Sequence, residues 1–202
     1  MSFNDYFPDI DDYDISDFRN IILYRWQYDV YAVKGVIEYI NKSLNSSISD
    51  EVKRQHFYNE NGQWREHEES LVKVAHLHSI SPFAFSSCVL SSYAIAEACI
   101  DRYCNLYSKK HDLKIQLSDI QGKGIDRALT YLEKVIQVEN IKSDGLHGKI
   151  KVVNDLRNDL IHRAGVPSNK NAKKYKEELG VDLSDEGIIE ILYDNAIYIH
   201  DL

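Results

Sequence analysis

Proline, glycine and cysteine are scarce in this chain, whose 202 residues include only 3 Pro, 9 Gly and 3 Cys. Because proline and glycine mark the turns between short strands, their scarcity argues against a sandwich or barrel and favours long helices. The three cysteines, Cys88, Cys99 and Cys104, are an odd count without a CxxC pair. They support neither a disulfide framework nor a four-thiolate zinc site, and we expect buried free thiols.

Long uncharged apolar runs are also missing, since none reaches the length of a membrane span. The acidic start MSFNDYFPDIDDYD is the opposite of a signal or transit peptide. These absences predict a cytoplasmic protein that makes no membrane contact. Hydrophobic residues make up 44% of the chain and charged residues 28%, which is typical of a globular domain.

The charge of the chain is unevenly distributed. Its net charge of −8 argues against a protein that coats nucleic acid nonspecifically. Residues 142–176 nevertheless contain nine Lys or Arg and three Asp, a balance of +6, which leaves −14 for the rest. A charged run is usually a solvated surface, so the basic segment indicates a functional site only if it also contains a motif. Residues 1–14 are interpreted as an acidic N-terminal tail and residues 15–202 as a helical domain.

Apolar periodicity predicts an all-α fold, an up-and-down bundle of four to five helices with a short β-turn near the C-terminus. The first helix is expected to begin at a cap, Ser16 or Asp17, and to carry one apolar stripe over about thirty residues. Asn45 and the serines after it should end this helix. The charged stretch around Gly62 is predicted to form one or two exposed helical pieces.

A second long helix is expected to begin at Ser81-Pro82, where a capping serine precedes a proline at the first helical position. It is apolar nearly all round and rich in small residues, which predicts the central buried helix of the bundle. Glu97 is a carboxylate within this apolar helix, so it is either paired or part of a site.

Three further segments are predicted in the second half of the chain. Apolar spacing indicates a shorter helix at residues 125–136 and another at 149–164, which Gly165 stops. Beyond it we expect a lysine-rich loop, a short apolar run at 187–192 that forms a strand or a turn, and a terminal helix.

The helix at 149–164 has an apolar stripe and, roughly opposite, a polar stripe of Asn154, Asn158 and His162. Arg157 lies roughly 140° around the axis from His162, so one helix alone makes a poor site. Two copies packed around a two-fold axis would bring both arginines and both histidines into one cleft. The sequence therefore predicts a homodimer whose basic segment lines that cleft.

These side chains suit the cleavage of RNA. A histidine with a solution pKa near neutrality can accept the proton of the ribose 2′-hydroxyl, and an arginine can hold the phosphate and offset developing charge. The 2′-hydroxyl is then the internal nucleophile, which leaves a cyclic phosphate, needs no metal and excludes DNA as substrate. Asn158 can orient the phosphate or the imidazole.

Residues 157–162, RNDLIH, resemble the R-x4-H motif of HEPN domains (higher eukaryotes and prokaryotes nucleotide-binding). These all-helical modules occur in toxin, abortive-infection and CRISPR-associated ribonucleases. The stretch SSYAIAEACIDRY, an alanine-rich helix with an embedded acid, precedes the motif helix as it often does in that family. By pattern, the resemblance covers residues 15–202.

The resemblance implies that Arg157 and His162 are the catalytic pair of a metal-independent endoribonuclease of toxin or phage-defence type, completed at a dimer interface. It implies a role for Asn158 less firmly. A toxin subgroup paired with nucleotidyltransferase antitoxins has a tyrosine two residues after the histidine. Ala164 stands there in this chain, so regulation by modification of that tyrosine is not supported.

We further expect Lys149, Lys151 and Arg163 to contact RNA and Glu97 to act as a supporting acid. No cofactor and no metal are expected. The expected partners are RNA, a second copy of the chain, and an antitoxin or regulatory protein. Two alternatives stay open: a noncatalytic HEPN-like module that binds RNA, nucleotide or protein through the same basic face, and an antitoxin or scaffold whose acidic surface meets a basic protein.

Overall fold

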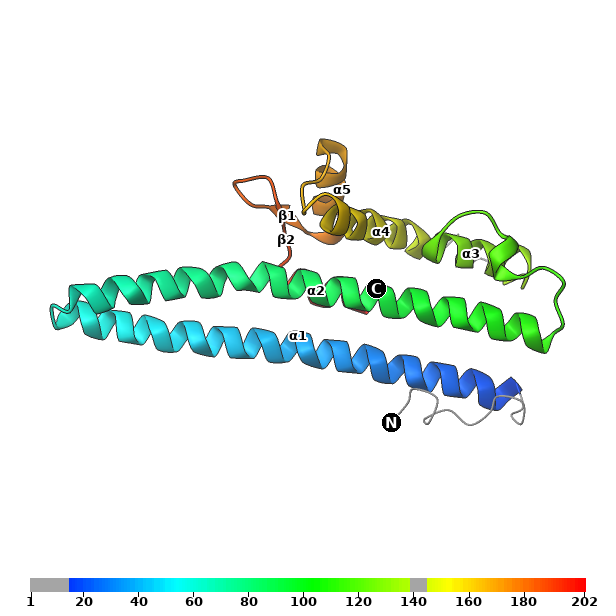
Figure 1. Ribbon diagram of the computed structural model, residues 1–202, viewed down its shortest axis with the longest axis horizontal. Helices are drawn as coiled ribbons and strands as arrows, with labels where there is room; N and C mark the ends of the chain where they lie inside the picture. The colour runs from blue at the N-terminus through cyan, green and yellow to red at the C-terminus, as the bar shows by residue number, and fades with distance from the viewer. Residues whose placement is uncertain (1–14, 139–144) are drawn as a thin grey trace.

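The computed structural model describes residues 15–138 and 145–202, and side chains from residue 27 onward except that of residue 146. The described chain contains six α-helices, one 3-10 helix and a two-stranded sheet, which confirms the all-α fold class (Figure 1). The order is α1 (Ile15–Glu60), α2 (Trp64–Lys110), η3 (Leu117–Asp119), α3 (Gly124–Lys134), α4 (Leu146–His162), α5 (Asn169–Leu179), β1 (Asp182–Leu183), β2 (Ile189–Glu190) and α6 (Tyr193–Asp201). The predicted acidic tail lies outside the described residues.

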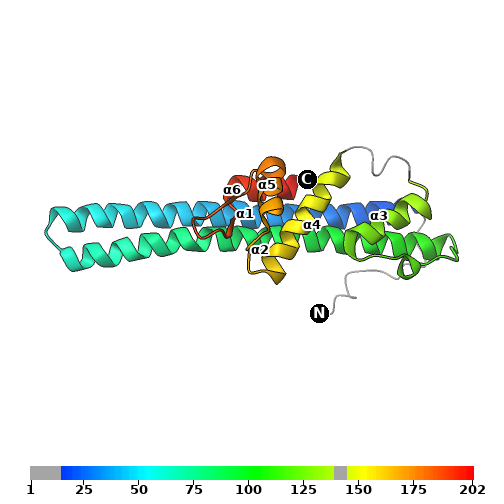
Figure 2. The same cartoon turned by 90° about the horizontal axis from the view of Figure 1, so that it is seen from above.

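α1 and α2 form one long antiparallel hairpin, and the remaining elements pack against only part of its length (Figures 1 and 2). The chain reverses at Gly62, whose φ of +68° is a left-handed conformation that glycine adopts without strain. The end of the hairpin near Gly62 protrudes beyond the other helices. α6 packs against both long helices, whereas α3 and α4 pack against α2.

The predicted end of the first helix at Asn45 is wrong, because α1 continues without interruption to Glu60. The predicted exposed pieces around Gly62 are instead the adjoining ends of α1 and α2. Ser70 on α2 is fully buried, and its Oγ donates to the backbone oxygen of Glu51 at 3.1 Å. Contact with α2 therefore keeps a serine-rich stretch helical although its intrinsic helix propensity is low.

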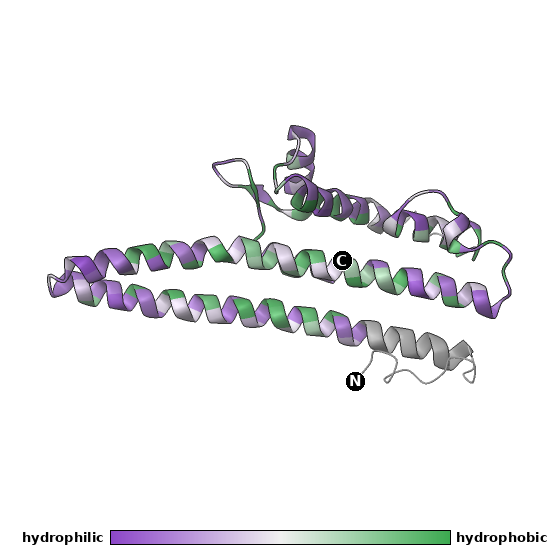
Figure 3. Ribbon diagram, in the orientation of Figure 1, coloured by the Kyte–Doolittle hydropathy of each residue, from purple (hydrophilic) through white to green (hydrophobic). Residues whose placement is uncertain are grey.

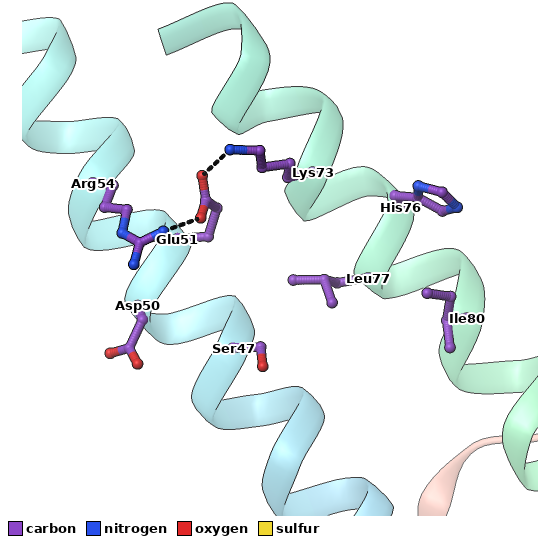
Figure 4. Close-up of a pocket in the computed structure, with 8 residues that line it drawn as sticks. All are labelled: Ser47, Asp50, Glu51, Arg54, Lys73, His76, Leu77 and Ile80. Atoms are coloured by element: carbon purple, nitrogen blue, oxygen red, sulfur yellow. Dashed lines mark hydrogen bonds and ion pairs between the residues drawn. The ribbon is translucent and has the colours of Figure 1, made fainter. Parts of the chain in front are cut away.

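Glu51 forms two ion pairs, one within α1 and one across the protruding part of the hairpin to α2. Its carboxylate accepts from Arg54 Nη1 at 3.2 Å and lies 3.8 Å from Lys73 Nζ on α2 (Figure 4). Glu51 is 7% exposed, and a carboxylate so deeply buried requires a cationic partner. The ion pair with Lys73 therefore favours this register of α1 against α2.

The predicted start of the second helix at Ser81-Pro82 is also wrong. α2 begins at Trp64, and Pro82 lies inside it. A proline within a helix removes one backbone hydrogen bond and crowds the preceding turn. α2 continues through this defect because α1 packs along it and α6 packs on the same region, where Phe85 contacts Tyr193 edge-on.

The lysine-rich segment after Gly165 forms α5 rather than the predicted loop. Ser168 caps this helix, with its Oγ accepting from the backbone N–H of Asn171 at 3.3 Å. Tyr175 and Leu179 lie four residues apart on one face and are both buried. The other predictions for this half are confirmed: α3, α4 and α6 are helices, and the apolar run contains β2, which pairs antiparallel with β1.

All three cysteines are free, as expected, with Cys88 and Cys104 buried and Cys99 half-buried. Burial raises the pKa of the Cys104 thiol to about 12 and also raises that of Cys88. Both buried thiols therefore stay protonated at neutral pH and serve as small apolar core residues.

Part of α2 is strongly apolar. Hydrophobic residues alternate along both long helices, whereas α4 and α5 are mostly hydrophilic (Figure 3). The prediction that no apolar run is long enough for a membrane span is wrong for α2. An 18-residue window of this helix has a mean hydropathy of 1.5, which is enough by length and composition to cross a membrane, and 22% of that window is buried. A single such helix is a weak indication of a membrane span, because core helices of soluble proteins pass the same test.

Replacing Pro82 by Ala should raise the free energy of unfolding by about 1–3 kcal/mol, because alanine restores the missing hydrogen bond inside α2. Urea unfolding followed by far-ultraviolet circular dichroism measures the change. Had Pro82 occupied the first turn of a helix, the same substitution would leave stability unchanged or lower it. Either of those results would contradict the helix start at Trp64.

Candidate functional site

Residues 157–162 form the last turns of α4, as predicted. α4 lies across the hairpin, and its C-terminal end projects past α2 on the side away from α1 (Figure 2). Val152, Val153 and Leu156 are buried, so the predicted apolar stripe is the face that packs inward. The motif therefore sits at a helix end whose inner face is anchored in the core.

Asp159, inside the motif, is the anchor between α4 and α5. It is 4% exposed, and its Oδ2 accepts from Tyr175 at 2.7 Å and from Asn171 at 2.9 Å. Arg163 pairs with Oδ1 at 3.4 Å. Burial alone would raise the pKa of Asp159, but these hydrogen bonds and the guanidinium outweigh burial and hold the pKa below its ordinary value.

A second contact holds the end of α4 in place. The backbone turns away through Ala164 and Gly165, with φ angles of +52° and +76°. Gly165 oxygen accepts from the N–H of Ile189 at 2.8 Å, which ties the helix end to β2. A Cβ on residue 165 would lie 3.2 Å from the side chain of Ile188, so glycine is needed for close approach as well as for the turn.

Arg157 is half-buried between α4 and α2. Its Nη1 donates to Asn158 Oδ1 at 2.9 Å, and its guanidinium lies 5.9 Å from the centre of the Tyr93 ring. A guanidinium over an aromatic face is attracted by the ring electrons. The structure thus brings Arg157 into contact with Asn158 and with the ring of Tyr93, whereas the sequence assigned Asn158 to the phosphate or the imidazole.

Tyr93 links the motif helix to Glu97. Its hydroxyl donates to Asn154 Oδ1 at 2.9 Å. A Cβ on Gly124 would lie 3.0 Å from Glu97 Oε1 and 3.9 Å from the Tyr93 hydroxyl, so the two side chains border the same small space. Burial, with a contribution from Glu97, raises the pKa of Tyr93 to about 12, so the phenol remains a neutral donor. Glu97 thus lies near Tyr93, and Tyr93 in turn contacts the motif helix.

His162 is the last residue of α4 and is exposed. The predicted polar stripe is therefore not uniform: His162 faces outward, whereas Asn154 faces α2 and bonds Tyr93. Arg157 points inward to α2 on the same helix. Within one chain the arginine and the histidine thus face different surroundings.

The three expected RNA-contacting cations differ in their surroundings. Lys151 is exposed. Lys149 donates to the Tyr198 hydroxyl at 2.7 Å, and this hydrogen bond raises the pKa of Lys149. Arg163 forms an ion pair with Asp159. Other cations of the basic segment are paired as well, Lys174 with Asp155 at 2.8 Å and Lys176 with Asp182 at 2.6 Å, so its positive charge is partly neutralised within the chain.

A cavity of about 260 Å³ lies on the inner side of α4, with Tyr93 and Val153 in its wall. Its lining is mostly apolar, and it also includes Ser92 and His200. It does not reach the exposed His162, so it is separate from the motif. Within the described ranges, no three His, Cys, Asp or Glu side chains gather in a way that would hold a metal ion.

Comparison with known proteins gives no family: no protein family model, no curated protein and no solved structure matches this chain.

Sequence reasoning missed two residues of this region, Tyr93 and Asp159. Tyr93 is spaced four residues from Glu97, which places both on one face of a helix, but this spacing does not reveal that its ring lies near Arg157. Asp159 is one of the three acids in the basic segment. A carboxylate between Leu156 and Leu160 on an amphipathic helix is a signal for a buried acceptor, but its donors on α5 lie 12 and 16 residues away and have no sequence pattern.

Replacing Asp159 by Asn should lower the free energy of unfolding at pH 7 by about 1–3 kcal/mol, because the buried donors lose a charged acceptor. Since folding lowers the pKa of this carboxyl, its contribution is present above the unfolded pKa of about 3.9 and is lost as pH falls through the folded pKa. Urea titrations at pH 7 and pH 3 should therefore show a smaller difference from wild type at pH 3.

Asp155→Asn is the matched control, because its ion pair with Lys174 is partly exposed and should contribute less than about 1 kcal/mol. An Asp159→Asn penalty of the same size at both pH values would show that the charge of Asp159 is not what stabilises the fold.

Proposed function

We propose that this protein is a HEPN-like, metal-independent endoribonuclease of toxin or phage-defence type that acts as a homodimer. The proposal assigns Arg157 to the phosphate, His162 to proton transfer and Asn158 to holding the arginine. It combines the resemblance of the RNDLIH motif with the place of residues 157–162 in the last turns of α4, whose C-terminal end projects past α2 (Figure 2).

The observation that carries the proposal is the set of contacts that Arg157 makes. Among the described residues it forms no ion pair with a carboxylate, whereas Arg163, Lys174 and Lys176 each have one. It is instead held by a neutral amide and an aromatic face. A positioned guanidinium whose charge is not already neutralised is suited to a phosphate, which it can bind with two parallel hydrogen bonds.

His162 supplies the second part of the chemistry. It is exposed at the end of α4, where a ribose can reach it. As general base it would take the proton of the 2′-hydroxyl; the freed oxygen attacks the adjacent phosphorus, and the bond to the 5′-oxygen breaks. The products are a 2′,3′-cyclic phosphate and a 5′-hydroxyl, which takes up a proton as it leaves. Arg157 would offset the negative charge that builds on the phosphate.

The geometry of one helix supports a site that is made by two copies. Five residues separate Arg157 from His162, which corresponds to about 7.5 Å of rise and roughly 140° of rotation. Together with the inward direction of the arginine, this separation argues against joint contact of one phosphate within a single chain. A partner related by a two-fold axis would present its own histidine beside this arginine.

His162→Ala and Arg157→Ala should each lower the rate of RNA cleavage by about a hundredfold or more, because each removes one half of the reaction. Cleavage is measured on a labelled single-stranded RNA in excess chelator, with a cyclic-phosphate assay on the products. His78→Ala, which removes an exposed histidine of α2 outside the motif, is the matched control.

No cleavage by the wild type, or equal cleavage by all three variants, would refute the nuclease proposal. RNA binding that weakens with salt, survives loss of His162 and yields no products would select the noncatalytic binding module instead.

Tyr93→Phe should lower the cleavage rate about fivefold, because it removes the hydrogen bond to Asn154 but keeps the ring beneath Arg157. Tyr93→Ala removes both contacts and should have a larger effect. Single-turnover rates at saturating RNA measure this, and circular dichroism confirms that both variants fold. If Tyr93→Ala folds and cleaves as fast as wild type, Tyr93 does not position the arginine.

A further inference from the structure

A stripe of exposed residues without Asp, Glu, Lys or Arg runs along α2. Its members follow one another at spacings of three or four, so they share one face of the helix. They are Val72, His76, Ile80, Phe83, Ser87, Ser91, Ala94 and Ala98. We call this set the α2 stripe; it extends over roughly 39 Å of helix. Phe83 is 76% exposed and Val72 is 68% exposed, values that are unfavourable for large apolar side chains in water.

The serine hydroxyl groups of the α2 stripe are hydrogen-bonded within the helix. Ser87 Oγ donates to the backbone oxygen of Phe83 at 3.0 Å, and Ser91 Oγ donates to that of Ser87 at 2.9 Å. Because these hydroxyl donors are already satisfied within the helix, burying the serines against a partner leaves no donor unpaired.

We propose that the α2 stripe is the interface between two copies of this chain, with their α2 helices antiparallel about a two-fold axis near Ser87. The α2 stripe is divided by size: its members before Ser87 are large, and those after it are small. Antiparallel packing places Phe83 against the partner's Ser91 and Ile80 against the partner's Ala94, so that large side chains fill the space left by small ones.

Charge at the two ends of α2 favours the same arrangement. The start of the helix carries three glutamates, Glu66, Glu68 and Glu69, against one arginine, and its end carries Lys109 and Lys110. Antiparallel packing sets the acidic start beside the partner's basic end. Parallel packing would oppose Phe83 to its own copy and like charges to like charges, which is unfavourable.

A lipid bilayer is a less suitable cover for the α2 stripe. α1 packs along α2 in the hairpin and carries exposed charged residues such as Glu38, Lys42 and Asp50. A membrane that received α2 would have to receive these charges as well, at considerable cost. A second copy covers the α2 stripe and leaves the charges of α1 in water.

This interface would bring the two motifs together. An axis perpendicular to the α2 pair keeps both α4 helices on the same side of it. The C-terminal end of α4 projects past α2 away from α1 (Figure 2), and it carries Ile161 and, just beyond, Val166, each 47% exposed. Both ends would therefore approach each other over the α2 pair. The consequence for RNA cleavage rests on the proposed function, whereas the interface itself does not.

Sedimentation equilibrium of the full chain tests the interface. The wild type should be a dimer at micromolar concentration, and Phe83→Asp should raise the dissociation constant by about 30-fold or more. Tyr39→Asp on α1 is the matched control, since Tyr39 is 72% exposed and lies outside the α2 stripe, and it should leave the dimer intact. A monomeric wild type, or an equal effect of both variants, would overturn the proposal.

Cysteine pairing tests the direction of packing. On mild oxidation, the double variant Phe83→Cys with Ser91→Cys should form a covalent dimer, whereas Phe83→Cys alone should behave like wild type. Efficient cross-linking by Phe83→Cys alone would indicate parallel packing and contradict the proposed arrangement. Flotation of the wild type with phosphatidylcholine vesicles that Phe83→Asp abolishes would assign the α2 stripe to lipid and overturn the proposal.

The same preparations separate the two proposals through RNA cleavage. A wild-type dimer that Phe83→Asp dissociates, but that cleaves no RNA, would support the interface and refute the nuclease. Cleavage that requires Arg157 and His162 in a protein whose dimer is unaffected by Phe83→Asp would support the nuclease and refute this interface.

Discussion

The apolar circumference of α2 is the constraint on which the rest of the structure depends. A helix that is apolar nearly all round is stable in water only when neighbours cover most of its sides. α1 covers one side along the hairpin, α6 packs in beside it, and α3 and α4 cover a further sector. The surface that these elements leave open includes the α2 stripe, and α4 packs against the same helix.

Two acids show how the same kind of residue serves different purposes in this chain. Asp159 is buried and satisfied by donors from α5, so it belongs to the scaffold that holds the end of α4. Glu97 lies near Tyr93 and contributes to the raised pKa of that phenol, which contacts the motif helix. Arg157 contrasts with both, because its neighbours are an amide and a ring that orient the guanidinium without neutralising its charge. The proposed function rests on this difference between Arg157 and the two acids.

Segments whose structure depends on local signals were predicted well. α4 ends at His162, close to the predicted stop at Gly165, because the chain turns away through the left-handed residues Ala164 and Gly165. The apolar spacing of α3 and α4 also matches their buried faces. The predictions failed where a distant contact outweighs a local signal. The serines after Asn45 and the proline at 82 disfavour helix, yet both lie within helices because the hairpin partner packs against them. Ser168 and the Tyr175–Leu179 spacing were available in the sequence but were outweighed by the abundance of lysine.

The sequence by itself determined the all-α class, the helix that carries RNDLIH and the exposure of His162, because each follows from a periodicity read within a few turns. Only the tertiary structure decided the lengths of α1 and α2, the direction of Arg157 toward Tyr93, and the pairing of Asp159 with α5. These features depend on residues that are distant in the chain, and no local pattern encodes which surfaces will meet. The free energy that fixes them comes from burial and from satisfied polar groups between elements, which exist only once the elements are packed.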